Sequence, residues 1–218
     1  MRTLKLAGAL IAVLALTALA AATAGAAETL WHWLPGAEKS KFSTANGEGV
    51  LETVGKANIT CKKSTGTGEL TKEMTLGVAT FDFTECKADG LVPYNSLGDP
   101  SGTVLVHAEL HNCLIAAGDR GILFKVTPVH LEIPAVDELV IVEGSFVGLV
   151  EPSEPKKAQK EYTLNITQKG GKQTIEKCEG GTKETLKSEF NENKKPEESG
   201  EEAKGSTVKF EIAQEAMA

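Results

Sequence analysis

The fold class follows from residues 77–83, which read Gly77-Val78-Ala79-Thr80-Phe81-Asp82-Phe83. In an extended chain the odd-numbered side chains from Ala79 to Phe83 lie on one face, and the even-numbered side chains lie on the other. The same alternation of apolar and polar residues recurs in residues 162–167 and 208–212. A period of two with one apolar face is typical of antiparallel strands that bury one side.

Turn-forming residues separate such stretches at intervals of about ten residues. The 218-residue chain holds 22 Gly and 8 Pro and only 5% aromatic residues, so its core must consist mainly of Val, Leu, Ile and Ala. The pattern predicts an all-β fold, with one antiparallel β-sandwich or barrel domain of roughly 8–12 strands over residues 27–218. The turn signals include Asn46-Gly47, Thr65–Gly68, Asp89-Gly90, Gly118–Gly121, Gly170-Gly171 and Gly180-Gly181.

The most apolar region, residues 122–150, predicts three strands at the centre of the sheet. Pro128 and Pro134 argue against a helix there, and Gly144 predicts a bulge or a close backbone approach. From the alternating stretches we expect an interior made of Phe81, Phe83, Leu123, Val140, Val142, Phe146, Leu164, Ile166, Phe210 and Ile212.

The last third of the chain is polar. Residues 183–189, which are rich in Glu and Lys around Leu186, predict a short helix. Residues 191–205 contain one apolar side chain, Ala203, and predict a charged mobile loop or an extended β-connection. Because three lysines lie among its glutamates, we interpret this loop as solvated rather than as a calcium-binding patch.

The N-terminus predicts a signal peptide over residues 1–26. Two basic residues precede the apolar stretch Leu6–Leu16, and Ala24-Gly25-Ala26 supplies the small residues that signal peptidase requires. Cleavage after this triplet would make the chain a secreted or cell-surface protein. The alternative is a membrane anchor retained over residues 6–27, which the Ala-rich second half and the lack of a following basic cluster disfavour.

The charge balance limits the classes of partner. The formal net charge is −7, and removal of the leader takes away two basic residues and no acidic one. Phosphate backbones and anionic membranes are bound by basic surfaces, so neither nucleic acid nor a membrane surface is expected as a partner of the processed chain. We expect instead an extracellular ligand or a component of the cell envelope.

Four cysteines, Cys61, Cys86, Cys113 and Cys178, remain in an exported chain. An even number in an oxidising compartment favours two disulfides, and no C-x-x-C spacing points to zinc. Three pairings are possible. We prefer Cys61–Cys86 with Cys113–Cys178, because the first two lie at strand ends of one continuous meander; the alternative is that one pair stays reduced and buried.

Several segments carry a resemblance to a known group of proteins. They are the leader, residues 47–53 (GEGVLET), Ile59-Thr60-Cys61, Thr65–Glu69, Phe83-Thr84-Glu85-Cys86 and Cys178-Glu179-Gly180-Gly181. Together they resemble a group of exported β-proteins of high-GC Gram-positive bacteria. The group has no assigned activity, so the resemblance implies export and an all-β fold and transfers no functional residue.

Candidate chemistry is limited to one strand. His107, Glu109 and His111 would share one face of it, which in composition resembles a metal site. Residues four apart on a strand lie ~13 Å apart, so both histidines cannot hold one zinc, and His130 with Glu132 would have to contribute. We therefore interpret these residues as an outward polar face and expect no cofactor. The chain has no nucleophile elbow, phosphate loop or metalloprotease motif.

Three classes of function follow from these observations. The first is a non-catalytic exported binding or structural protein, because a β scaffold and disulfides are present without a nucleophile and base pattern. The second is a small-ligand carrier with a cavity inside a closed barrel. The third is a secreted metal-dependent enzyme that uses the strand with His107, Glu109 and His111. The tryptophans near the start, Trp31 and Trp33, are expected to pack on the end of the barrel rather than to form a sugar platform.

Overall fold

The computed structural model describes residues 31–34, 40–71, 76–152, 158–191 and 195–217. Within them the chain forms fifteen β-strands and one 3-10 turn, Ala116–Gly118. The all-β class predicted from the alternating side chains is confirmed. The expected signal peptide lies outside the described residues, and the described part of the chain has no helix with the length and hydropathy needed to span a membrane.

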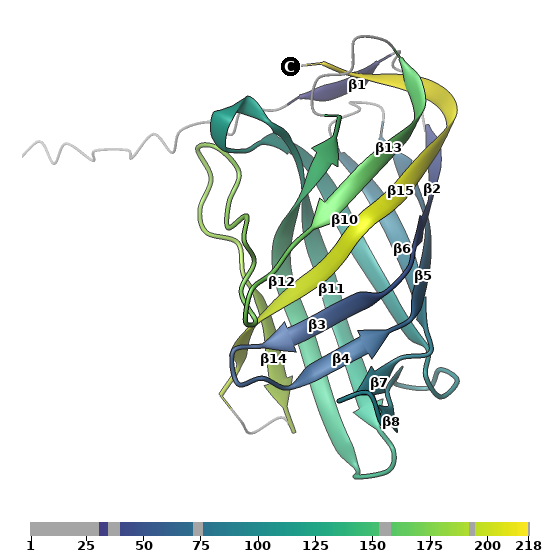
Figure 1. The fold of residues 1–218 in the computed structure, drawn as a ribbon, viewed down its shortest axis with the longest axis vertical. Coiled ribbons are helices and arrows are strands. Elements are labelled where there is room, and N and C mark those ends of the chain that lie inside the picture. The colour runs from purple at the N-terminus through teal and green to yellow at the C-terminus, as the bar shows by residue number, and fades with distance from the viewer. Residues whose placement is uncertain (1–30, 35–39, 72–75, 153–157, 192–194, 218) are drawn as a thin grey trace, which may run out of the picture.

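Eight antiparallel strands close into a barrel (Figure 1). In order around the barrel they are β13 (Gln159–Ile166), β12 (Glu138–Glu151), β11 (Arg120–Ile133), β10 (Val104–Leu114), β6 (Leu76–Thr84), β5 (Lys63–Leu70), β2 (Lys41–Asn46) and β15 (Glu197–Met217). β15 pairs back onto β13 and completes the ring. Closure gives each barrel strand a neighbour on both sides and so satisfies its backbone hydrogen-bonding groups.

Shorter strands extend this barrel, mainly at the lower end in Figure 1. β3, β4, β7 and β8 follow one another outward from the first half of β15, while β9 pairs with β11 and β1 pairs with the end of β15. The bounds are β1 (His32–Leu34), β3 (Gly49–Thr53), β4 (Asn58–Cys61), β7 (Lys87–Ala88), β8 (Val92–Pro93), β9 (Asn95–Ser96) and β14 (Leu186–Phe190).

Two strands share the space between β12 and β15. β13 pairs with the second half of β12, and β14 pairs with its first half. On β15 the pairs with β14 end at Ser199, and the pairs with β13 begin at Ala203. Residues 200–202 of β15 therefore have a strand neighbour, β3, on one side only. We call residues 200–202 the seam of the barrel wall.

The apolar region 122–150 forms two long strands instead of the expected three. β11 and β12 have 14 residues each and are joined by a hairpin. The expected close backbone approach at Gly144 is present. Its φ is +110°, and a Cβ there would lie 2.2 Å from the carbonyl oxygen of Thr185. A side chain at this position would separate β12 from the start of β14.

One prediction for the polar C-terminal third is wrong, because residues 186–190 form strand β14 rather than part of a helix. Of the two alternatives for residues 191–205, the structure has the extended one from Glu197 onward and not the mobile loop. These residues are the start of β15, in which Ser199 and Ala203 are buried. The pattern was hidden because the inward-facing side chains of this stretch are Ser, Glu and Ala rather than large apolar residues.

The barrel interior is packed mainly with aliphatic side chains and a row of aromatic rings. The rings of Phe124 and Phe146 stack at a centroid distance of 4.8 Å. Of the residues expected inside, Leu123 is buried against the outer side of the barrel wall, and Ile212 is 48% exposed. Ile212 lies where the β13–β15 register shifts, so the alternation along β15 does not hold there. The remaining residues of the expected interior belong to the main core.

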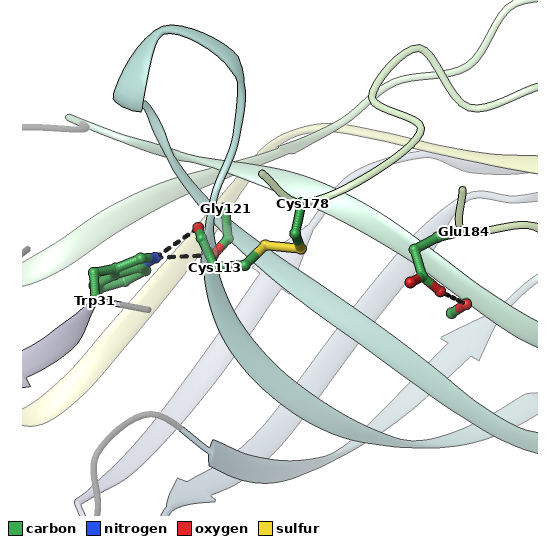
Figure 2. The surroundings of a disulfide bond; sticks show 6 residues. Trp31, Cys113, Gly121, Cys178 and Glu184 are labelled. Atoms are coloured by element: carbon green, nitrogen blue, oxygen red, sulfur yellow. Dashed lines mark hydrogen bonds between the residues drawn. A yellow bond between two sulfur atoms is a disulfide. The ribbon is translucent and has the colours of Figure 1, made fainter. Parts of the chain in front are cut away.

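A second, smaller core lies outside the wall. Residues 167–185, which we call the outer segment, run from β13 to β14 over the outer side of β10, β11 and β12. The Cys113–Cys178 disulfide attaches the outer segment to β10 (Figure 2). Both cysteines pack with Leu123 and Val147. The other disulfide joins Cys61 to Cys86. These are the two pairings that the sequence analysis prefers.

Replacing both Cys113 and Cys178 by Ser should release the outer segment. Loss of a bridge between residues 65 apart should lower the free energy of unfolding by about 4 kcal/mol. Trypsin should then cut the variant first at the lysines of this segment, as read by mass spectrometry of early fragments. Replacing Cys61 and Cys86 should cost a similar free energy and leave the segment protected. Equal protection of the outer segment from trypsin in both variants would contradict the conclusion that the Cys113–Cys178 disulfide holds this segment on the barrel.

Candidate functional site

The strand with His107, Glu109 and His111 lies on the outer wall, as its alternation predicts. His107 Nδ1 is 2.9 Å from the hydroxyl of Thr80, and His111 Nε2 is 3.7 Å from the carboxylate of Glu109. His130 is exposed on β11. The described part of the chain contains no group of three or more His, Cys, Asp or Glu side chains placed to hold a metal ion. The structure thus does not bring these weak metal candidates together into one site.

The barrel interior contains a cavity of about 110 Å³. Its walls are mainly apolar side chains that point inward from β6, β10, β11, β12 and β13. Phe81 and Phe83 are half-buried because part of their surface faces this space. Oxygen-bearing side chains in the lining are those of Thr44, Asn46, Ser64, Ser206 and Glu201. Apart from the disulfide-bonded Cys61, Glu201 has the only side chain in the lining that can ionise.

Glu201 reaches the cavity because it lies in the seam. Its strand neighbour is Leu51 of β3, and the two inward positions next to it on β15 are Ser199 and Ala203, both buried. Because every second side chain of a strand lies on the same face, the Glu201 side chain also points into the barrel. β13 ends at Ile166 and β14 begins at Leu186, so no strand covers Glu201 on that side.

The carboxyl of Glu201 is held without a partner. Among the described residues, none donates a hydrogen bond to it or forms an ion pair with it. Burial raises the pKa of this carboxyl from its ordinary value of 4.5 to about 8, and the negative charge of Glu202 adds to the rise. Removal of a carboxylate from water disfavours the charged form, which is why burial acts in this direction. In the empty cavity Glu201 is therefore mainly protonated at pH 7.

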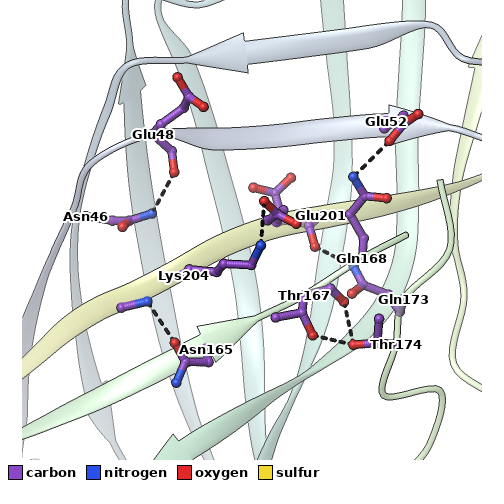
Figure 3. Close-up of polar contacts among 12 residues, drawn as sticks. Asn46, Glu48, Glu52, Asn165, Thr167, Gln168, Gln173, Thr174, Glu201 and Lys204 are labelled. Carbon is purple, nitrogen blue, oxygen red and sulfur yellow. Dashed lines mark hydrogen bonds and ion pairs between the residues drawn. The ribbon is translucent and has the colours of Figure 1, made fainter. Parts of the chain in front are cut away.

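The outer segment covers the seam from outside. Gln173 donates a hydrogen bond from Nε2 to the backbone carbonyl of Glu201 at 3.1 Å, and Gln168 donates to Glu52 of β3 at 2.9 Å (Figure 3). The Gln173 amide thus supplies a backbone bond that a neighbouring strand would otherwise make, while Gln168 bonds to a side-chain carboxylate of β3. Gly171 has a φ of +78°, and a Cβ there would lie 2.3 Å from the backbone of Thr53. The outer segment thus contacts the edge of β3 through a glycine.

A second cavity, of about 100 Å³, lies toward the lower end of the barrel. Leu51 and Ile59 line both cavities and separate them. The hydroxyl of Thr53 is buried in the lining of the lower cavity and has no hydrogen-bonding partner among the described residues. Burial, together with the charge of Glu138, raises the pKa of Tyr94 in the same lining, so this phenol stays protonated.

The upper end of the barrel is closed by Trp31. Its indole is fully buried and donates from Nε1 to the carbonyl oxygens of Cys113 and Gly121, both at 3.0 Å (Figure 2). Asn112 donates in turn to the carbonyl of Trp31 at 3.1 Å. The expected packing on the barrel end is confirmed for Trp31. The side chain of Trp33 lies outside the described part.

Sequence reasoning missed Glu201 altogether. It was one of several glutamates in a stretch interpreted as solvated. The one signal available is that Ser199 and Ala203, which share a strand face with Glu201, are small, whereas Glu198 and Glu202 on the other face are charged. This signal is weak, because Gly200 interrupts the charged face and Glu201 itself is acidic.

Replacing Glu201 by Gln should stabilise the protein relative to the wild type, by a margin that grows as the pH rises. The folded protein keeps the Glu201 proton up to about pH 8, while the unfolded chain releases it near pH 4.5. Between these values the unfolded state binds fewer protons, so this group lowers the stability of the wild type as the pH increases. The difference in free energy of unfolding between variant and wild type should grow by on the order of 3 kcal/mol from pH 5 to pH 8.

Denaturant unfolding at several pH values measures this difference, and groups common to both proteins cancel. Glu211→Gln is the matched control, because Glu211 lies on the same strand and its side chain is exposed outside the cavity. The control should show a much smaller change with pH. A flat difference for Glu201→Gln would show that the carboxyl is solvated.

Comparison of the chain with protein-family models, with curated protein sequences and with solved structures gives no match. The resemblance to exported proteins of high-GC Gram-positive bacteria stays a prediction. The function proposed below rests on the geometry of the barrel interior.

Proposed function

We propose that this chain is an exported, non-catalytic binding protein that holds a small, mainly apolar molecule inside its barrel. The observation that carries the proposal is the cavity of about 110 Å³ within the closed barrel. Closely packed proteins rarely leave such a space, and apolar cavities of similar size hold small molecules. The proposal joins the binding and carrier classes of function considered from the sequence.

The cavity volume limits the size of the ligand. Sites for drug-sized ligands span ~300–1,000 Å³, whereas an apolar cavity of ~150 Å³ holds a ring of six carbons. A cavity of about 110 Å³ therefore suits a ligand of about five non-hydrogen atoms. A longer apolar tail would have to displace Leu51 or Ile59 to reach the lower cavity.

The side chains around the cavity support binding rather than catalysis. Acid–base and nucleophilic mechanisms need at least two groups within reach of one another. In the described lining Glu201 is the one side chain that can ionise, and all four cysteines are in disulfides. His107 and His111 lie on the outer wall, away from this space, so they do not favour the metal-dependent enzyme.

Export is supported by the cysteines and by the leader. Two disulfides are consistent with an oxidising, extracytoplasmic location. Residues 1–26 have the basic start, apolar stretch and small-residue cleavage pattern of a signal peptide. A secreted or cell-surface binding protein would meet its ligand outside the cell or within the cell envelope.

Small neutral molecules should bind in the barrel interior and compete with side chains added there. We expect 1-butanol to bind with a roughly millimolar dissociation constant and to raise the melting temperature, as measured by ligand-observed NMR and thermal unfolding. Ala203→Leu fills the cavity and should abolish binding. Ala45→Leu, on the exposed face of β2, is the matched control and should bind as the wild type does.

Val126→Leu also enlarges a cavity-lining side chain and should weaken binding if Ala203→Leu does not fold. Absence of binding to the wild type, or binding that both variants leave unchanged, would refute the proposal.

Protein recovered from the culture medium of its own host should begin near Ala27. Signal peptidase cleavage after Ala26 removes the leader, so intact-mass analysis should give the mass of residues 27–218 with both disulfides formed. Titration of denatured protein with a thiol reagent should find no free thiol. Recovery of membrane-bound material that still begins at Met1 would contradict export by cleavage and favour the retained anchor.

A further inference from the structure

We propose that the Glu201 carboxylate binds the ammonium group of a small alkyl amine whose apolar chain occupies the cavity of about 110 Å³. This inference rests on the proposed function and specifies its ligand class. It follows from the position of one acidic side chain in an otherwise apolar space. The ligand would supply the cation that the described residues do not provide.

The first argument is the missing partner of Glu201. Ionisable groups that are largely removed from solvent are almost always paired or hydrogen-bonded, because burial of a polar group without a partner is unfavourable. Glu201 is half-buried, its carboxyl points into a cavity, and the described residues provide neither a donor nor a cation for it. A Leu or Ile at this position would fill the space and remove the penalty. A carboxyl with room beside it is the arrangement expected of a ligand site.

The second argument is the choice among ligand chemistries. A carboxylate ligand could accept the proton of neutral Glu201, but it would bring its own negative charge into an apolar cavity whose lining contains no cation, which is unfavourable. A calcium ion takes six to eight oxygen ligands, and the lining has one carboxylate with a few hydroxyl and amide groups. A neutral alcohol can form a hydrogen bond and gains no charge attraction. An ammonium group donates to the carboxylate, and neighbouring aromatic rings favour cations.

The third argument is the charge around the site. The cavity-facing residues of β3, β4, β6, β12, β13 and β14 do not titrate, apart from disulfide-bonded Cys61. Outside the cavity, Glu202 pairs with Lys204, Glu52 of β3 accepts from Gln168, and Lys172 of the outer segment lies 4.0 Å from Glu198. None of these groups neutralises Glu201, and the charge of Glu202 disfavours its ionised form.

Binding should consequently depend on pH. Alkyl amines have a pKa near ~10, above the value of about 8 for the Glu201 carboxyl, so the bound pair is an ammonium and a carboxylate. Below pH 8 binding must release the Glu201 proton to solvent. Affinity for an amine should therefore rise about thirtyfold from pH 6.5 to pH 9, following the fraction of ionised Glu201.

The experiment compares n-butylamine with 1-butanol, which have the same number of non-hydrogen atoms. Dissociation constants are measured by ligand-observed NMR from pH 6.5 to pH 9 in phosphate and borate, because amine buffers would compete. At pH 9 we expect n-butylamine to bind at least tenfold more tightly than 1-butanol. Glu201→Gln should remove this preference and the rise with pH, and it should still bind 1-butanol. The control Glu211→Gln should keep the preference.

The outcomes separate this inference from the proposed function. If both probes bind the wild type equally, or if Glu201→Gln keeps the amine preference, the inference is wrong and the barrel remains a site for neutral ligands. If neither probe binds, both the inference and the proposed function are wrong. Circular dichroism and the melting temperature of Glu201→Gln establish that a lost preference does not come from unfolding.

Discussion

The rest of the structure depends on the pairing of β15. This strand has 21 residues and pairs along its length with β1, β2, β3, β13 and β14. A strand longer than its neighbours must be covered in sections, because an unpaired backbone group in the interior is unfavourable. β13 and β14 supply two sections on one side, and they do not meet. The seam at residues 200–202 is a consequence of this arrangement, and the Gln173 side chain of the outer segment bonds to its backbone from outside.

The seam explains why a polar group and a cavity occur together. A continuous strand in place of the gap between Ile166 and Leu186 would bring inward side chains that fill the space beside Glu201. The disulfide Cys113–Cys178 and the glutamine contacts instead hold the covering segment on the outside of the wall. The outer segment thus adds hydrogen bonds without placing side chains inside the barrel. A cavity with one carboxyl is what remains inside.

The sequence predicts most of the barrel and little of the site. Strands such as β6 and the end of β13 show a clear alternation, because large apolar residues occupy every second position. The stretch from Glu197 to Gly205 does not, because its inward residues are small or acidic and its strand character comes from pairing with β3 and β14. The prediction that Ile212 lies inside is wrong for a related reason, because the register shift near this residue is set by tertiary pairing. Local patterns report burial only where burial is apolar and regular.

A comparison of Glu201 with the strand that carries the histidines shows why geometry decides between candidate sites. The strand with His107, Glu109 and His111 has the composition of a metal site, yet it lies on the outer wall. There His107 and Glu109 are exposed and His111 is half-buried, and exposed charges interact weakly. Glu201 is a single residue without a motif, yet its surroundings shift its protonation and leave it unpaired. The low-dielectric interior strengthens each interaction that a ligand makes with this carboxyl. The proposed recognition of an amine therefore depends on the place where the barrel wall is incomplete.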